Sequence, residues 1–109
     1  MSGARTLIRV PASARAGEVI EIQAAIAHPM ETGHRPGPDG KVLPRNIVRR
    51  FSCRYDGATV FEAELFPAIA ANPYLSFTTV ATRSGELRFA WEGDEGFAHV
   101  ETRMLRVDG

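Results

Sequence analysis

The sequence predicts an all-β fold. Apolar and polar residues alternate with a period of two in short runs, and glycine, proline and aspartate separate these runs. The 109 residues suffice for one compact domain but not for two, so we treat 1–109 as a single domain. About seven short strands at this spacing are typical of an immunoglobulin-like antiparallel β-sandwich, with an open barrel as the alternative.

The N-terminal half is expected to supply three strands. Leu7–Val10 is a short first strand that ends at Pro11, because proline cannot donate to a sheet. Val19–Ala27 follows, with its isoleucines on one face and its glutamate and glutamine on the other. Ile47–Tyr55 is the third strand, and its apolar face includes Cys53.

The C-terminal half is expected to supply four more strands, each bounded by turn residues. Its strongest local signal is Asp56-Gly57, since a type I′ hairpin turn needs positive φ at both central positions. The expected strands are Val60–Leu65, Tyr74–Val80, Leu87–Trp91 and Phe97–Val107, with turns at Asn72-Pro73, Ser84-Gly85 and Gly93–Gly96 and a break at Pro67.

The charges balance overall but not locally. The chain has 13 basic and 13 acidic residues, so net charge indicates neither a nucleic-acid nor a membrane partner. Between His28 and Arg54, however, six basic residues face only two acidic ones. This basic middle predicts either the footprint of an acidic partner or a set of internal ion pairs.

The connection from Pro29 to Asn46 is longer than an ordinary hairpin loop, a property typical of functional or disordered segments. His28 could cap its first turn or bind a partner, and Met30 could be exposed or packed. Positive charge on this loop, including Arg35 and Arg45, could attract acidic partners.

Cys53 is the single cysteine, so it forms neither an internal disulfide nor a thiolate zinc site. Its place between Phe51 and Tyr55 on an apolar strand face predicts a buried core thiol. The alternatives are a reactive thiol, which needs a nearby histidine and an exposed setting, and a bridge to a partner.

Other chemistries fit the sequence poorly. The set of His28, Met30, Cys53 and His99 has the ligand types of a blue-copper site but not its spacing, because such sites take cysteine, histidine and methionine from one late loop. The acidic turn at 92–95 resembles a calcium loop only in charge. We therefore expect no catalytic residue, metal or cofactor, and a binding module.

Short motifs spread over most of the chain narrow this interpretation. In order they are Pro11-Ala12-Ser13-Ala14, Ala16-Gly17-Glu18, His28, Met30–Gly33 with Arg35, Asp39-Gly40, Pro44-Arg45, Phe51, Cys53, Asn72-Pro73-Tyr74 with Phe77, and Phe89 with Trp91. Each motif is weak alone, but their order and spacing together are specific. On these motifs the chain resembles the SoxZ family, one half of the SoxYZ sulfur-carrier complex of bacterial thiosulfate oxidation.

The resemblance implies an immunoglobulin-like sandwich and a non-catalytic role in a heterodimer with SoxY. SoxY supplies a flexible glycine-rich C-terminal segment whose cysteine carries sulfur intermediates. Since Leu105–Gly109 contains neither cysteine nor a glycine run, this chain is not expected to carry the substrate. Its expected task is to stabilise SoxY and help present the intermediates to three transiently docking enzymes, a c-type cytochrome, a hydrolase and a sulfane dehydrogenase.

The resemblance also changes the expected compartment. Residues 1–6 contain no apolar stretch of the kind that forms a signal peptide, which by itself indicates the cytoplasm. SoxZ proteins are thought to reach the periplasm folded with SoxY, so we expect the periplasm. An unpaired Cys53 could bridge to a partner there, and the isolated chain could form a homodimer.

The partner-binding candidates are therefore His28, Met30, Glu31, Arg35, Arg45 and Cys53. Two other classes of protein remain open. A small metal-binding or redox β-sandwich predicts bound metal, and a generic immunoglobulin-like interaction module predicts no dependence on SoxY.

Overall fold

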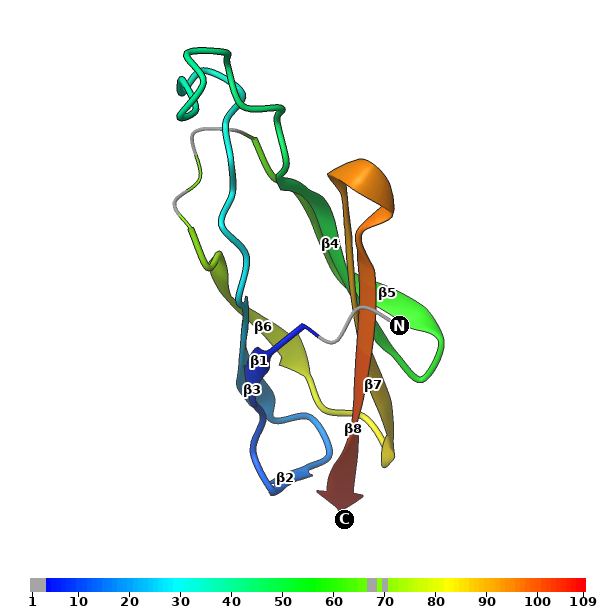
Figure 1. Ribbon diagram of the computed structural model, residues 1–109. Helices are drawn as coiled ribbons and strands as arrows, with labels where there is room; N and C mark the ends of the chain where they lie inside the picture. Colours follow the sequence, from blue (N-terminus) through cyan, green and yellow to red (C-terminus); the bar gives the residue numbers. More distant parts are fainter. Residues whose placement is uncertain (1–3, 67–68, 70) are drawn as a thin grey trace.

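The computed structural model describes residues 4–66, 69 and 71–109, and they form two facing β-sheets (Figure 1). The three-stranded sheet has the order β1 (Thr6–Arg9), β3 (Val19–Ile26), β6 (Tyr74–Val80). The five-stranded sheet has the order β2 (Ser13–Arg15), β8 (Ala98–Asp108), β7 (Gly85–Gly93), β4 (Val48–Tyr55), β5 (Ala58–Glu64). The prediction of an all-β, immunoglobulin-like sandwich is confirmed.

The strand count differs from the prediction by one. The seven expected strands are present with ends shifted by a few residues, and β2 is the eighth. Beyond Pro11 the chain crosses from the three-stranded to the five-stranded sheet, where β2 pairs in parallel with the end of β8. Three residues are too few for a period of two to be recognised. The expected break at Pro67 and residues 1–3 lie outside the described part of the chain.

The core lies between the sheets and is centred on aromatic rings. Phe51 of β4 is fully buried, and its ring centroid lies 5.1–6.4 Å from those of Phe61, Phe77, Phe89 and Trp91. The alternating apolar residues of β3 and β7 close the core on either side. Burial of each such side chain contributes about 1.5–3 kcal/mol.

The turns that the sequence marks are present. Asp56 and Gly57 have φ values of 50° and 86°, as the predicted type I′ turn requires. Asn72, before Pro73, also has positive φ, at 55°. The Tyr55 hydroxyl accepts the backbone N–H groups of Thr82 and Arg83 at 3.1 and 3.0 Å, which ties the end of β4 to the turn between β6 and β7.

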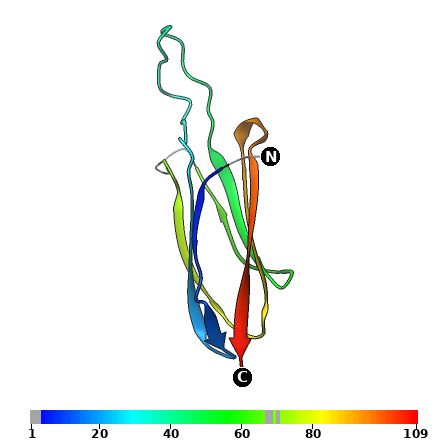
Figure 2. The same ribbon diagram turned by 60° about the horizontal axis from the view of Figure 1, so that its bottom comes forward.

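The connection between β3 and β4 leads from one sheet to the other, because these two strands belong to different sheets. It extends beyond the sandwich at one end of the molecule, while the C-terminus lies at the other end (Figure 2). The molecule is accordingly elongated, with extents of 61 × 25 × 19 Å. We refer to residues 29–46 as the projecting loop.

Candidate partner-binding site

His28 anchors the base of the projecting loop. Its backbone N–H donates to Oδ1 of Asn72 at 2.9 Å, and the Asn72 N–H donates back to the His28 carbonyl at 2.8 Å. The residue is 5% exposed. Its imidazole packs edge-on against the Phe97 ring, with 5.0 Å between ring centroids, and its Nδ1 accepts the Met30 N–H at 3.0 Å. Burial lowers the pKa of His28, partly opposed by the Asn46 side chain, so the ring is held neutral.

Met30 forms the second contact at the base. It is 4% exposed, and its thioether sulfur accepts the N–H of Val48 at 3.2 Å. Its φ of 52° is unusual for a residue other than glycine and turns the chain into the loop. His28 and Met30 therefore lie behind the surface, and they can influence a partner only through the conformation of the loop.

The projecting loop is a narrow hairpin with its own hydrogen bonds. Glu31 and Asn46 exchange two N–H···O bonds of 2.8 Å each, and the Leu43 N–H donates to the Arg35 carbonyl at 2.8 Å. At Gly33, where φ is +86°, a Cβ atom would lie only 3.0 Å from Cβ of Arg45. The two sides of the hairpin approach so closely there that a side chain on Gly33 would force them apart.

Two arginines that are predicted to bind a partner, Arg35 and Arg45, form ion pairs within the chain. The Arg35 guanidinium contacts Glu31 at 2.6 Å. Arg45 donates to both carboxylate oxygens of Asp94 at 2.8 Å, and Arg49 contacts the same carboxylate at 3.2 Å. The hydrogen bonds from Arg45 hold the pKa of Asp94 below its usual value. Internal ion pairs thus account for much of the basic middle, and Arg45 ties the loop to the turn after β7.

The tip of the loop leaves a cation and an apolar side chain exposed. The chain reverses at 37–40, where the Gly37 N–H donates to the Lys41 carbonyl at 2.6 Å and the Asp39 carboxylate accepts the Lys41 N–H at 3.0 Å. Val42 is 59% exposed. Lys41 forms no ion pair within the part of the chain that the structure describes. Sequence reasoning missed Val42, because one exposed valine in a loop has no periodic pattern.

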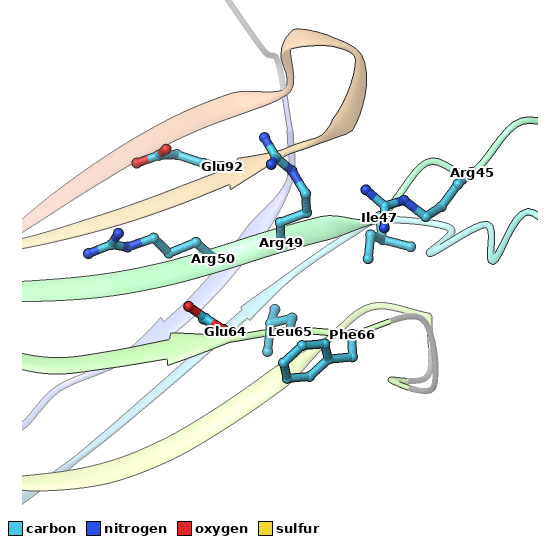
Figure 3. Close-up of a pocket in the computed structure, with 8 residues that line it drawn as sticks. All are labelled: Arg45, Ile47, Arg49, Arg50, Glu64, Leu65, Phe66 and Glu92. Carbon is cyan, nitrogen blue, oxygen red and sulfur yellow. The ribbon is translucent and has the colours of Figure 1, made fainter.

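A hollow of about 390 Å³ lies below the loop, between β4 and the segment after β5 (Figure 3). Its basic side is formed by Arg49 and Arg50, and its apolar side by Leu65 and Phe66. Phe66 is 60% exposed although it is large and apolar. Arg45 lies at the loop end of the hollow, so the hollow and the base of the projecting loop form one continuous surface.

Cys53 does not belong to that surface. It is fully buried, as the core interpretation predicts, and its neighbours across the strands are Phe61 and Phe89. Burial raises the pKa of its thiol to about 12, so the thiolate is scarce at neutral pH. Among the described residues, no three His, Cys, Asp or Glu side chains lie close enough together to bind a metal ion. The described part of the chain contains no helix that is long and apolar enough to span a membrane.

These features define a class of protein, an immunoglobulin-like β-sandwich with a projecting hairpin. Solved structures of several proteins share the fold. Neelaredoxin, a superoxide reductase from Ignicoccus hospitalis, is 15% identical with a TM-score of 0.73, covering 94% of this chain and 80% of that one. The sulfur carrier protein SoxY from Chlorobium limicola f thiosulfatophilum is 14% identical with a TM-score of 0.68, covering 95% and 79%. No curated protein matches the chain.

The family model described as sulphur oxidation protein SoxZ matches residues 8–103, so the chain belongs to the SoxZ family. Membership makes it a protein of the Sox system of sulfur oxidation. The family is generally a non-catalytic carrier subunit, and it implies SoxY as a partner.

Proposed function

We propose that this chain is the non-catalytic subunit of a SoxYZ sulfur-carrier complex. It binds SoxY and helps present the cysteine-bound sulfur intermediates of SoxY to the c-type cytochrome, the hydrolase and the sulfane dehydrogenase of thiosulfate oxidation. The family match over residues 8–103 is the observation that carries the proposal. The burial of Cys53 supports it, because a thiol with a pKa near 12 is unsuited to carry sulfur itself.

The projecting loop is the proposed contact element. Glu31, Arg35 and Arg45 hold its hairpin shape through the pairs described above, and His28 and Met30 fix its base. A loop held in one conformation loses little conformational entropy on binding. The exposed Lys41 and Val42 then offer charge and apolar contact at the tip.

We further propose that the complex acts in the periplasm and that the chain is exported there with SoxY. In the absence of SoxY, surface that is normally covered would be free, so the isolated chain can pair with a second copy.

Co-expression with SoxY from the same organism tests the proposal. A stable one-to-one complex is expected in size-exclusion chromatography. Because Cys53 is buried, the intact mass of this chain should be the same with and without reductant, and no covalent link to SoxY should be present. Replacing both Lys41→Glu and Val42→Ser should weaken the complex or its sulfur transfer. The matched pair Arg15→Glu and Val19→Ser, at the opposite end of the sandwich, should not. If no complex forms at micromolar concentration, the SoxYZ assignment is wrong and a generic immunoglobulin-like interaction module is favoured.

A further inference from the structure

The outer face of the five-stranded sheet carries two arginines side by side. Arg54 of β4 lies directly opposite Arg88 of β7 in the strand register, and both are exposed. Thr59 of β5 is opposite Arg54, and Thr102 of β8 is opposite Arg88. The four residues therefore form one row across four strands, which we call the basic row. Each of its side chains can donate a hydrogen bond, and none of them carries negative charge.

Within the described residues, the two arginines of the basic row form no ion pair. Neither guanidinium forms an ion pair with a carboxylate of residues 4–66, 69 or 71–109, whereas Arg45 and Arg49 share Asp94 and Arg50 pairs with Glu62. Like charges directly opposite each other destabilise a sheet. Glu92 lines one hollow with both arginines but forms no ion pair with either guanidinium, so an anion from outside that contacts both arginines would stabilise this arrangement.

A hollow of about 300 Å³ adjoins the basic row. Its floor is formed by Ser52 and Ala90, which lie opposite each other in the register and are small, while Glu92 lies at its far side. Val100 of β8 is opposite Ala90 and is 45% exposed, and Met104 on the same face is 71% exposed. The face thus combines two cations without a direct ion pair among the described residues, room for an inserted side chain, and apolar surface beside them.

We propose that the basic row and its hollow form a docking site for an acidic surface of a transient partner, one of the enzymes that act on the carrier complex. This inference rests on the proposed function. An enzyme carboxylate would receive charge-assisted hydrogen bonds from Arg54 and Arg88, and apolar contact would be made with Met104. SoxY is not the proposed occupant, because the cores of stable interfaces are depleted of charge, whereas charged patches accelerate transient encounters.

The test uses the complex with SoxY and the three purified Sox enzymes. Replacing both Arg54→Glu and Arg88→Glu should leave the SoxY complex intact but lower the association rate constant of at least one enzyme by about tenfold at low salt. The unchanged complex should itself bind that enzyme more slowly as NaCl is raised. Arg9→Glu with Arg15→Glu is the matched control, with the same change of net charge on exposed arginines of β1 and β2.

A second variant guards against misfolding. Arg54→Thr with Arg88→Thr suits a strand and removes the cations without adding negative charge, so it should slow binding by a smaller factor. Equal effects of the control pair, or unchanged rates for all three enzymes, would overturn the docking site while leaving the SoxY complex in place. Failure of the unchanged chain to bind SoxY would instead overturn the proposed function.

Discussion

The sandwich and the projecting loop are held together by different forces. In the sandwich, Phe51 is fully buried and touches four other aromatic rings. Within residues 29–46, only Met30 is buried, and the hairpin depends on backbone hydrogen bonds and on the ion pairs of Arg35 and Arg45. Because apolar burial depends little on salt or pH while exposed ion pairs depend on both, the loop can change shape under conditions that leave the sandwich folded.

The largest effect is expected from a substitution that creates a cavity in the sandwich. Phe51→Ala should lower the free energy of unfolding by about 3–5 kcal/mol, because it removes the ring that four others contact. Urea titration followed by the fluorescence of Trp91, the single tryptophan, measures the change. Val42→Ala at the loop tip is the control and should change the midpoint negligibly. Similar losses for both variants would contradict the distinction between sandwich and loop.

A pH titration probes the junction between the two regions. His28 is buried and neutral with a lowered pKa, so the unfolded chain binds a proton more readily than the folded one. The contribution of His28 to stability is therefore present above its ordinary pKa, near 6.5, and is lost as the pH falls below it. One such group adds a slope of at most about 1.4 kcal/mol per pH unit.

The slope of the free energy of unfolding against pH should become shallower in His28→Gln. It should stay unchanged in His34→Gln, since His34 is exposed on the loop. Urea midpoints measured between about pH 5 and about pH 8, a range that spans the ordinary pKa of histidine, give the slope of stability against pH for each variant. Equal slopes in the two variants would assign the pH dependence to groups other than the loop base.

Two glycines sharpen the picture of the loop itself. Gly33 and Gly40 have nearly the same positive φ, +86° and +81°, so alanine at either position costs about 1 kcal/mol in backbone conformation. Only at Gly33 would the added Cβ meet Arg45, whereas at Gly40 nothing lies within 4 Å. Gly33→Ala should therefore weaken SoxY binding more than Gly40→Ala, measured by calorimetry. Equal effects would mean that the hairpin need not be closed for binding.

Much of the sandwich was predictable because burial imposes a pattern on the chain. The alternation in Val19–Ile26 and Val48–Tyr55 is the direct mark of one face toward the core, and it also placed Cys53 inside. The site was less accessible to prediction. Arg45 and Asp94 are 49 residues apart, and the opposition of Arg54 to Arg88 depends on strand register, so neither pairing leaves a local pattern in the sequence.

Releasing the loop from the sandwich should affect dynamics more than stability. Arg45→Ala removes the two hydrogen bonds to Asp94, but Arg49 keeps its contact with the same carboxylate, so the free energy of unfolding should fall by no more than about 1 kcal/mol. The amides of Glu31 and Asn46, which bond each other, should exchange with solvent faster. Arg103→Ala, which removes an exposed pair with Glu101 on β8, is the control and should leave these two amides protected. Unaltered exchange in Arg45→Ala would mean that the hairpin is stable without the sandwich.

The smallest expected effect has the opposite sign and occurs in the sandwich. Arg54→Thr removes one of two like charges that face each other and introduces a residue suited to strands, so it should raise the free energy of unfolding by about 0.2–1 kcal/mol. In a protein that already carries Arg88→Thr, the same substitution should raise the free energy of unfolding by less, because the repulsion is already absent. This double-mutant cycle measures the interaction between the two arginines. If the variant is more stable but its SoxY complex binds Sox enzymes more slowly, the pair of Arg54 and Arg88 serves binding at the expense of stability. Equal gains in both backgrounds would mean that the two guanidiniums do not repel, and the local cost that motivates the docking site would be absent.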